Sequence, residues 1–487
     1  MRLKDLPRLL HCEERLVRDV AVTSITEDSR RVTAGSVFVA VSGEHQDGHD
    51  FASAAVEAGA IAVIGNRLRT AEWSGVPYFH HDQPRKALGI VAHALMGDPT
   101  QDMTVIGVTG TNGKSSTVLL TQRILRDTGH RAACFGTLGY DVGGSVAPAP
   151  HTTPFGEDLA GLFQRARVAG DTHAVMEVSS HALEQERVAG IRFAVGAFTN
   201  LTQDHLDYHQ DMNAYLRAKL MLFERIEGDG CFTVANADDP SAEAFVNASR
   251  VRCFTYGKTG DCRAANIRMA ASETSFQLET PWGKGDCITG LVGRHNVSNA
   301  LCAATICGGL GIPVARICEG ISGLRSVPGR FERIESDRGF QVVVDYAHTD
   351  DGLRNVLQAA REICGGKVIL VFGCGGDRDK GKRPKMGKVA AELADFSFVT
   401  SDNPRTEDPE RILLDIEVGL QHAGRRKYDD YVLITDRATA IREAIARAKP
   451  GDLVMIAGKG HEDYQILGTK RIHFDDREVA RAILEET

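Results

Sequence analysis

Several features that identify common protein classes are missing from this sequence of 487 residues. No apolar run approaches the roughly 20 residues that a membrane span needs, and residues 1–10 carry charges throughout, so we expect neither a membrane span nor a signal peptide. Basic residues number 57 against 65 acidic ones, which gives a net charge of -8. Because nucleic-acid surfaces need a basic stripe, we expect no nucleic-acid partner.

The cysteine pattern argues against a disulfide framework and against a zinc site. The 11 cysteines are an odd number and contain no CxxC pair, and the 17 histidines contain no HExxH motif. Cys302, Cys307 and Cys318 lie in an apolar stretch and are expected to act as small core residues. These features favour a reducing compartment, and we expect a cytoplasmic protein.

Length and patterning predict an α/β protein of about three domains. Short apolar runs such as 104–108 and 368–372 alternate with segments of helical spacing such as 115–127, which is typical of parallel sheets with crossover helices. Segment 253–288 is rich in Thr, Ser and Gly and predicts short antiparallel strands instead. We place the domains at residues 1–100, 101–329 and 330–487.

A glycine-rich turn, Gly110-Thr111-Asn112-Gly113-Lys114-Ser115, lies between an expected strand and an expected helix. Such a turn presents backbone N–H groups to phosphate, while the lysine reaches the outer phosphates and the Ser hydroxyl ligates Mg²⁺. The strict phosphate-loop pattern fails at its first position, which is Val108. The alternative is an ordinary strand–turn–helix with chance glycines.

Polar side chains follow two further strands. Glu177 ends the apolar run 174–178, and the run 200–209, dense in polar and imidazole groups, follows a strand at 195–199. Strand carboxyl ends line the ligand crevice of an open α/β sheet, where a carboxylate suits Mg²⁺. A helix-capping cluster and a solvated loop are the alternatives.

The sequence resembles the ATP-dependent Mur ligases and the related folylpolyglutamate synthases. Six motifs in matching order carry the resemblance, at 109–115, 177–181, 200–207, 293–300, 328–332 and 345–348. The resemblance implies a small N-terminal α/β domain for a UDP-linked substrate, a central P-loop ATPase with a parallel sheet, and a C-terminal Rossmann-like domain that receives an amino acid.

The resemblance also implies ATP as co-substrate, Mg²⁺ as cofactor, and a carboxylate that is activated as an acyl phosphate before an amine attacks it. Lys114, Lys219 and His205 match catalytic positions. Lys219 matches a lysine that the family carbamylates, although by itself it reads as a lysine on a helix surface. The matching metal positions are Ser115, Glu177, His205 and carbamylated Lys219. The matching ATP positions are Gly110, Thr111, Asn112, Gly113, Lys114, Ser115, Ser116, Asn296, Arg330 and Asp345.

The remaining matches concern the two substrates to be joined. Positions that match contacts to a UDP-N-acetylmuramoyl-dipeptide are Ser29, Glu44, His45, Gln46, Thr152, Thr153, Ser179, Gln185 and Arg187. The tetrapeptide at 402–405 resembles the motif of family members that add meso-2,6-diaminopimelate, since Arg405 offers a planar fork for the distal carboxylate. The full set there is Arg378, Asp402, Asn403, Pro404, Arg405, Gly458 and Glu462.

Simpler interpretations remain open for these segments. Asp28 and Ser29 are also what a capped turn needs, and 402–405 is also what an Asx–Pro turn with a surface arginine looks like. Competing functions are a lysine-adding ligase, a folylpolyglutamate synthase and a nucleotide-binding regulator without catalysis. We expect the ligase that adds diaminopimelate, acting as a monomer.

Overall fold

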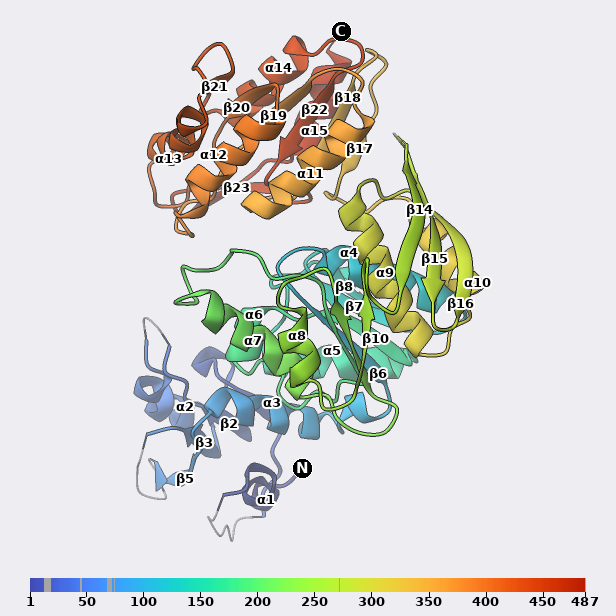
Figure 1. The fold of residues 1–487 in the computed structure, drawn as a ribbon. Helices are drawn as coiled ribbons and strands as arrows, with labels where there is room; N and C mark the ends of the chain where they lie inside the picture. The colour runs from blue at the N-terminus through green and yellow to red at the C-terminus, as the bar shows by residue number, and fades with distance from the viewer. Residues whose placement is uncertain (13–18, 44–45, 68–71, 74, 271, 487) are drawn as a thin grey trace.

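The computed structural model describes residues 1–12, 19–43, 46–67, 72–73, 75–270 and 272–486, and arranges them in three successive α/β bodies (Figure 1). The expected three-domain α/β fold is confirmed. In Figure 1 the central body lies between the N-terminal and the C-terminal one. None of the helices in the described ranges is long and apolar enough to cross a membrane.

The N-terminal body is built on a five-stranded sheet of order β1-β2-β3-β5-β4. Its strands β2 and β3 are fully buried, and apart from Ser36 their side chains are apolar on both faces, as in other sheets covered by helices. The strands are β1 (Ser24–Thr26), β2 (Ser36–Val39), β3 (Ala62–Gly65), β4 (Glu72–Trp73) and β5 (Val76–His80). The helices are α1 (Leu6–Leu10), α2 (Ala52–Glu57) and α3 (Pro84–Leu95).

The central body contains an eight-stranded sheet of order β13-β12-β11-β6-β10-β7-β8-β9. β8 pairs antiparallel with both β7 and β9, and the other neighbouring strands pair parallel. Its strands are β6 (Thr104–Thr109), β7 (Ala132–Gly136), β8 (Gly139–Val142), β9 (Ser145–Ala147), β10 (His173–Glu177), β11 (Val195–Phe198), β12 (Phe232–Asn236) and β13 (Arg252–Tyr256). Its helices are α4 (Lys114–Asp127), α5 (Gly156–Ala169), α6 (Ser180–Glu184), α7 (Met212–Glu224), α8 (Ala242–Ala248), α9 (Arg294–Gly309) and α10 (Val314–Gly323).

The expectation of antiparallel strands across 253–288 is wrong at its start. β13 pairs parallel with β12 and extends the main sheet, since Phe254 and Tyr256 turn inward to its core. The antiparallel strands form a separate sheet of β14 (Arg263–Met269), β15 (Thr274–Thr280) and β16 (Gly283–Thr289).

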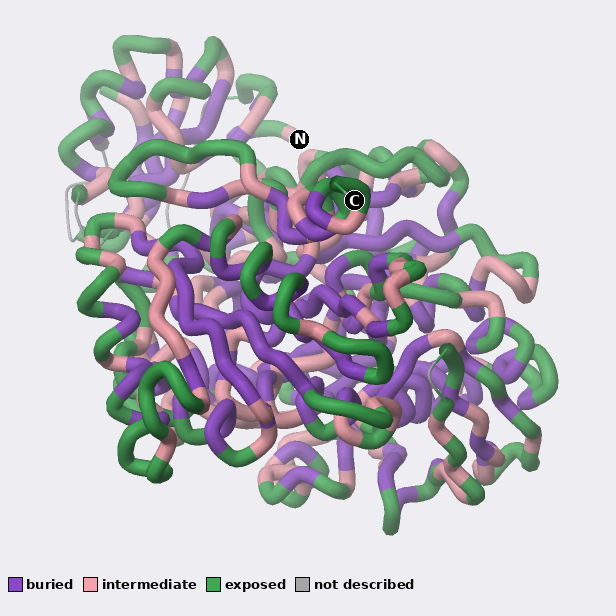
Figure 2. The backbone as a smooth tube through the Cα atoms, turned by 90° about the horizontal axis from the view of Figure 1, so that it is seen from above, coloured by how far each residue is buried: buried purple, intermediate pink, exposed green. Residues whose placement is uncertain are grey.

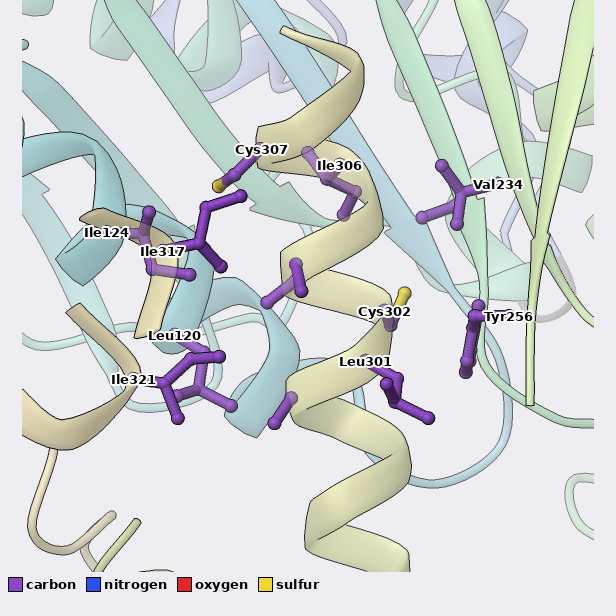
Figure 3. Close-up of a cluster of buried hydrophobic side chains, with 14 of the residues drawn as sticks. Leu120, Ile124, Val234, Tyr256, Leu301, Cys302, Ile306, Cys307, Ile317 and Ile321 are labelled. Carbon is purple, nitrogen blue, oxygen red and sulfur yellow. The ribbon is translucent and has the colours of Figure 1, made fainter. Parts of the chain in front are cut away.

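A large apolar core joins one face of the main sheet to α4, α9 and α10 (Figure 3). In that view Leu301, Cys302 and Ile306 project from α9 among side chains of the neighbouring strands and helices. Cys302, Cys307 and Cys318 are all buried there, which confirms their expected role as core residues. This packing fixes α4, and with it the turn at its N-terminus.

The C-terminal body has a six-stranded sheet of order β17-β18-β22-β19-β20-β21, parallel except for β17. Its strands are β17 (Glu332–Ile334), β18 (Gln341–Asp345), β19 (Val368–Phe372), β20 (Phe396–Val399), β21 (Tyr431–Leu433) and β22 (Leu453–Ala457), followed by the hairpin β23 (Tyr464–Leu467) and β24 (Lys470–His473). Its helices are α11 (Asp350–Ile363), α12 (Lys382–Leu393), α13 (Pro409–His422), α14 (Arg437–Arg447) and α15 (Asp476–Glu485). Figure 2 shows the buried segments in the interior and most exposed ones on the outside.

Side-chain hydrogen bonds connect the central and C-terminal bodies at the carboxyl ends of their parallel strands. Arg330 donates to the hydroxyl of Ser115 at 3.3 Å, and Gln203 donates to Asp379 at 3.0 Å. Both bodies therefore face one crevice, where ligands of open α/β sheets bind.

Candidate active site

The glycine-rich turn between β6 and α4 has the backbone geometry that a phosphate-binding loop needs. Gly110 and Gly113 have φ values of +151° and +85°, which favour glycine. A Cβ at Gly110 would lie 1.8 Å from the Thr199 hydroxyl, so the turn packs directly against the end of β11. Its backbone N–H groups open onto the positive end of the α4 dipole, where anions are favoured.

The polar run after β11 holds this turn in place. Asn200 accepts a hydrogen bond from the Asn112 N–H at 2.9 Å and donates to the Asn112 carbonyl at 3.0 Å. The Thr199 hydroxyl donates to the same carbonyl at 2.6 Å. The first residues of segment 200–207 therefore support the glycine-rich turn, so this segment is not a free solvated loop.

Two lysines converge on one backbone carbonyl. Lys114 Nζ and Lys219 Nζ each donate to the Gly110 oxygen at 2.9 Å, and Lys219 is 1% exposed. Burial lowers the pKa of Lys219 well below its ordinary value, and the charge of Lys114 lowers it further. Lys219 is thus a buried amine with a tendency to be neutral, and not a lysine on the helix surface.

Glu177 lies at the end of β10 beside the hydroxyl of Ser115, which donates to its Oε1 at 2.9 Å. Thr137 donates to the same carboxylate from its N–H at 2.8 Å and from its hydroxyl at 3.3 Å. These oxygens are donors of the kind that Mg²⁺ prefers. The described residues contain no preformed group of three His, Cys, Asp or Glu ligands, so a Mg²⁺ here would complete its shell with other oxygens.

His205 lies in a left-handed turn, with φ of +55°, near enough to Lys219 for the charge of that lysine to lower its pKa. Burial lowers its pKa to about 3, against a partial opposing effect of Asp204, so the ring is neutral and able to bind a metal. Asp204 itself contacts two groups of the C-terminal body, His348 at 3.6 Å and Lys382 at 3.7 Å. His205 therefore lies where the two bodies meet.

A pocket of about 380 Å³ extends from the glycine-rich turn between the two bodies. Of the sequence-predicted ATP residues, seven line it, namely Asn112, Gly113, Ser115, Ser116, Asn296, Arg330 and Asp345. The other three, Gly110, Thr111 and Lys114, form the turn beneath. Burial raises the pKa of Asp345, whose carboxylate accepts the N–H groups of Phe331 and Ala347 at 2.6 and 2.7 Å.

Sequence reasoning missed several residues of this pocket. Asp239 follows β12, and the rule that strand ends line the crevice could have found it. Asp351 and Asn355 come from α11, and Asp351 accepts a hydrogen bond from Asn112 at 3.0 Å. No local signal marks these two, because their place depends on how the bodies dock.

Residues predicted for the muramoyl-dipeptide gather beside Glu177. Thr153 donates to the Glu177 carbonyl at 2.9 Å, and Arg187 donates to the Thr153 carbonyl at 3.1 Å and to Gln185 at 2.7 Å. The Thr152 hydroxyl lies 3.1 Å from that of Thr137, and Ser179 caps α6. These five residues thus form one connected polar cluster beside Glu177.

The predicted uridine-binding positions lie in the N-terminal body. Ser29 begins a short 3₁₀ helix whose N-cap is Asp28, which is the simple capped turn that the sequence left open. Gln46 is exposed, and its carbonyl accepts a hydrogen bond from the Gly43 N–H at 2.9 Å. Glu44 and His45 lie outside the described residues.

The residues predicted for diaminopimelate come together at the carboxyl ends of β19, β20 and β22. Asn403 donates to Glu462 at 3.0 Å, and a Cβ at Gly458 would lie 2.6 Å from an Asp402 oxygen. Arg405, which follows Pro404, donates to the Gly376 carbonyl at 2.7 Å. The side chains of Arg405 and Arg378 both approach Gly375, where an added Cβ would lie 3.0 Å from Arg405 Nη1 and 3.8 Å from Arg378 Cγ. Burial and the nearby charge of Arg378 lower the pKa of Arg405.

Three family models match consecutive parts of the chain. The Mur ligase family catalytic domain matches residues 21–94, the Mur ligase middle domain residues 108–307, and the Mur ligase glutamate ligase domain residues 329–460. A MurF ligase from Thermotoga maritima in complex with ADP is similar in fold, with a TM-score of 0.64 at 19% identity over 96% of this chain and 98% of that one.

Full-length relatives are also similar. The UDP-N-acetylmuramoyl-L-alanyl-D-glutamate–2,6-diaminopimelate ligase of Bacillus licheniformis is 46% identical over 96% of both chains. The protein of the same name from Geobacter metallireducens is 42% identical over 100% of this chain and 99% of its own. A solved structure of that name has a TM-score of 0.70 at 32% identity, over 100% and 99% of the two chains. Similarity of this extent, over all three bodies, shows that the chain belongs to the Mur ligase family.

Proposed function

We propose that this chain ligates meso-2,6-diaminopimelate to UDP-N-acetylmuramoyl-L-alanyl-D-glutamate with cleavage of ATP to ADP and phosphate, as a step in peptidoglycan precursor synthesis. The observation that carries the proposal is the approach of two arginine side chains, Arg378 and Arg405, to Gly375, in a loop cluster that also holds the carboxylates of Asp402 and Glu462. Relatives at 42–46% identity that carry this name support it.

ATP binds in the 380 Å³ pocket, with its phosphates on the glycine-rich turn. Lys114 is held against the Gly110 and Thr111 carbonyls at 2.9 Å, so it needs only a small movement to reach a phosphate placed on the turn. Arg330, which bonds to Ser115, adds a second positive group from the C-terminal side. Phosphoryl transfer depends mainly on such positioning and charge neutralisation.

The acceptor carboxylate lies beside the polar cluster of Thr152, Thr153, Ser179, Gln185 and Arg187. Its oxygen attacks the γ-phosphorus, the bond to the β-phosphate oxygen breaks, and ADP leaves. The product is an acyl phosphate. Lys114 stabilises the charge that develops on the transferred group, since a positioned cation in a site that excludes water is worth several kcal/mol.

Diaminopimelate enters from the C-terminal body. Its attacking amine is neutral when it adds to the acyl carbon, and phosphate leaves with the oxygen that came from the carboxylate. We place the distal carboxylate on Arg405 and Arg378, and the distal ammonium on Asp402, Asn403 and Glu462. The loop residues Pro404 and Gly458 shape this space from the backbone.

The donors present fit magnesium, which when bound supplies charge neutralisation at the transferred phosphoryl group. Ser115 and Glu177 would hold one ion. His205 and a carbamate on Lys219 would hold a second. Lys219 is suited to carbamylation because a neutral buried amine can add to carbon dioxide and release a proton, which leaves an anionic oxygen ligand in place of the neutral amine.

A lysine-adding ligase is the second candidate. Lysine lacks the distal carboxylate, so it would leave Arg405, whose pKa burial and the charge of Arg378 already lower, without that counter-charge. A folylpolyglutamate synthase would have no use for the N-terminal uridine site. The geometry therefore favours diaminopimelate.

The three domains divide these tasks along the proposed boundaries. Residues 1–100 bind the uridine nucleotide through Ser29, Glu44, His45 and Gln46, residues 101–329 bind ATP and the dipeptide, and residues 330–487 bind diaminopimelate. All these groups belong to one chain, so we propose a monomeric enzyme. We place it in the cytoplasm, where ATP and nucleotide-linked precursors are found.

The test is a competition experiment. Purified protein with ATP, Mg²⁺ and the UDP-linked dipeptide is given equal concentrations of meso-diaminopimelate, L-lysine and L-glutamate, and the nucleotide products are identified by mass. We expect the diaminopimelate adduct to dominate. A dominant lysine or glutamate adduct would reject the proposal, as would phosphate release without any adduct.

A further inference from the structure

Lys459 is a fully buried lysine that none of the steps above uses. It lies just after β22, between Gly458 and Gly460, and its side chain is 0% exposed. Its Nζ lies 3.3 Å from Asn403 Oδ1 and 3.2 Å from Glu462 Oε2. A buried cation is tolerated only when paired, so these two contacts account for its position.

The contacts of Lys459 fix the orientation of the Asn403 amide. Asn403 Oδ1 accepts from Lys459 and also from the Ile466 N–H, at 3.0 Å. An atom that receives two donors must be the carbonyl oxygen, so the amide NH₂ points the other way. There it donates to Glu462 Oε2 at 3.0 Å.

Lys459, Asn403 and Glu462 therefore form a closed triangle. Both donors of the triangle converge on Oε2 of Glu462, while the one hydrogen bond that its Oε1 receives from the described residues is from the Tyr346 hydroxyl at 3.5 Å. That leaves Oε1 to accept a hydrogen bond from a ligand. The neighbouring Asp402 is affected too: burial raises its pKa, but Lys459 and Arg437 lower it more, which keeps this carboxylate charged.

We propose that Lys459 is a positioning residue for the amino-acid substrate, because it orients Asn403 and Glu462 so that one carboxylate oxygen is presented to a substrate ammonium group. This inference rests on the proposed function, in which this crevice receives the amino acid. Lys459 touches the substrate at no point. It acts through the two side chains that it holds.

The test compares Lys459→Met, which keeps the length of the chain but removes its charge and donors, with Lys459→Arg and with the control Lys449→Met. Lys449 is exposed and precedes β22. We expect Lys459→Met to raise the KM for diaminopimelate about 10- to 100-fold and to change the KM values for ATP and the UDP-linked dipeptide less than twofold. Lys459→Arg should recover part of the loss, and the control should match wild type.

A double-mutant cycle with Glu462→Gln separates positioning from stability and also keeps the test available if Lys459→Met does not fold. The double variant has no unpaired buried charge, so it should fold. If Lys459 acts through Glu462, then adding Lys459→Met to Glu462→Gln should raise the KM for the amino acid less than threefold. Full additivity, or equal losses for all three substrates, would overturn the inference.

Failure of the proposed function gives a different result. If wild type uses lysine or glutamate instead of diaminopimelate, the proposed substrate is wrong. The KM of Lys459→Met is then compared with that of wild type for the amino acid that wild type does use. A selective rise there supports the positioning role, and its absence overturns it. A wild type that uses no amino acid contradicts both.

Discussion

Replacing Arg405 by alanine should selectively weaken the use of meso-diaminopimelate. One amino group of the Arg405 guanidinium donates to the Gly376 and Asn403 carbonyls at 2.7 and 3.4 Å, and the described part of the chain provides no acceptor for its other donors, which can therefore bind a ligand. The two loops stay connected without it, because the Gly376 N–H donates to the Asn403 carbonyl at 2.9 Å. The backbone at 405 has φ of +51°, and alanine bears the same strain there as arginine.

The size of the effect follows from the lost contact. A bidentate, charge-assisted contact to a carboxylate, partly compensated by the remaining charge of Arg378, should be worth about 2–4 kcal/mol, or roughly 30- to 1000-fold in kcat/KM. KM should rise more than kcat falls, since the distal carboxylate is remote from the reacting amine. The kcat/KM of Arg405→Lys should lie between those of wild type and Arg405→Ala, because lysine keeps the charge and loses the planar fork of donors.

The assay is steady-state kinetics with each of the three substrates varied in turn, for wild type, Arg405→Ala, Arg405→Lys and Arg411→Ala. Arg411 is an exposed arginine on α13 and should behave like wild type. The KM values for ATP and the UDP-linked dipeptide should stay within twofold. A KM for diaminopimelate that changes less than threefold, or an equal loss for all substrates, would refute the role given to Arg405.

Three further substitutions test other parts of the site and the fold. Lys114→Ala should reduce ligation at least about 1000-fold with an unchanged circular dichroism spectrum, because it removes charge stabilisation at the transferred phosphoryl group; near-normal turnover would remove Lys114 from the mechanism. Lys219→Ala should be nearly inactive and partly rescued by added formate or acetate, whereas full activity without them would contradict the carbamate. His93→Leu should reduce the loss of stability in acid. Burial lowers the pKa of His93 to about 4 from 6.5, so its contribution to stability is present above about pH 6.5 and is lost as the pH falls towards 4. Urea unfolding measures how far the free energy of unfolding falls between pH 7 and pH 5. This fall should be about 2 kcal/mol smaller in His93→Leu than in wild type, and an equal fall would contradict this reasoning.

The elements of the fold that can be read from the sequence are those with a strong local signal. The strands β6 and β19 lie where the apolar runs 104–108 and 368–372 predict them, because parallel strands buried on both faces are continuous apolar segments. The turn at 110–115 was found for a similar reason, since its glycines meet a local backbone requirement. The start of β13 was misassigned because its polar residues hide the two inward-facing aromatic side chains.

The parts of the site that depend on contacts between domains escape local reasoning. Asp351 reaches the glycine-rich turn only because α11 docks there, and nothing in its neighbourhood marks it. The helical surroundings of Lys219 in the sequence indicate a surface lysine, whereas the fold buries it against the Gly110 carbonyl. Lys459 stands between two glycines with no pattern, and its triangle with Asn403 and Glu462 joins loops that are far apart in sequence.

The central claim is that this crevice activates the acceptor carboxylate as an acyl phosphate and passes it to diaminopimelate. The most direct measurement uses the UDP-linked dipeptide with both oxygens of its reacting carboxylate labelled with ¹⁸O, followed by mass analysis of phosphate and nucleotide product from one reaction with ATP and meso-diaminopimelate. We predict one labelled oxygen in the phosphate and the other in the amide of the diaminopimelate adduct. Unlabelled phosphate, or a labelled phosphate without that adduct, would contradict the account.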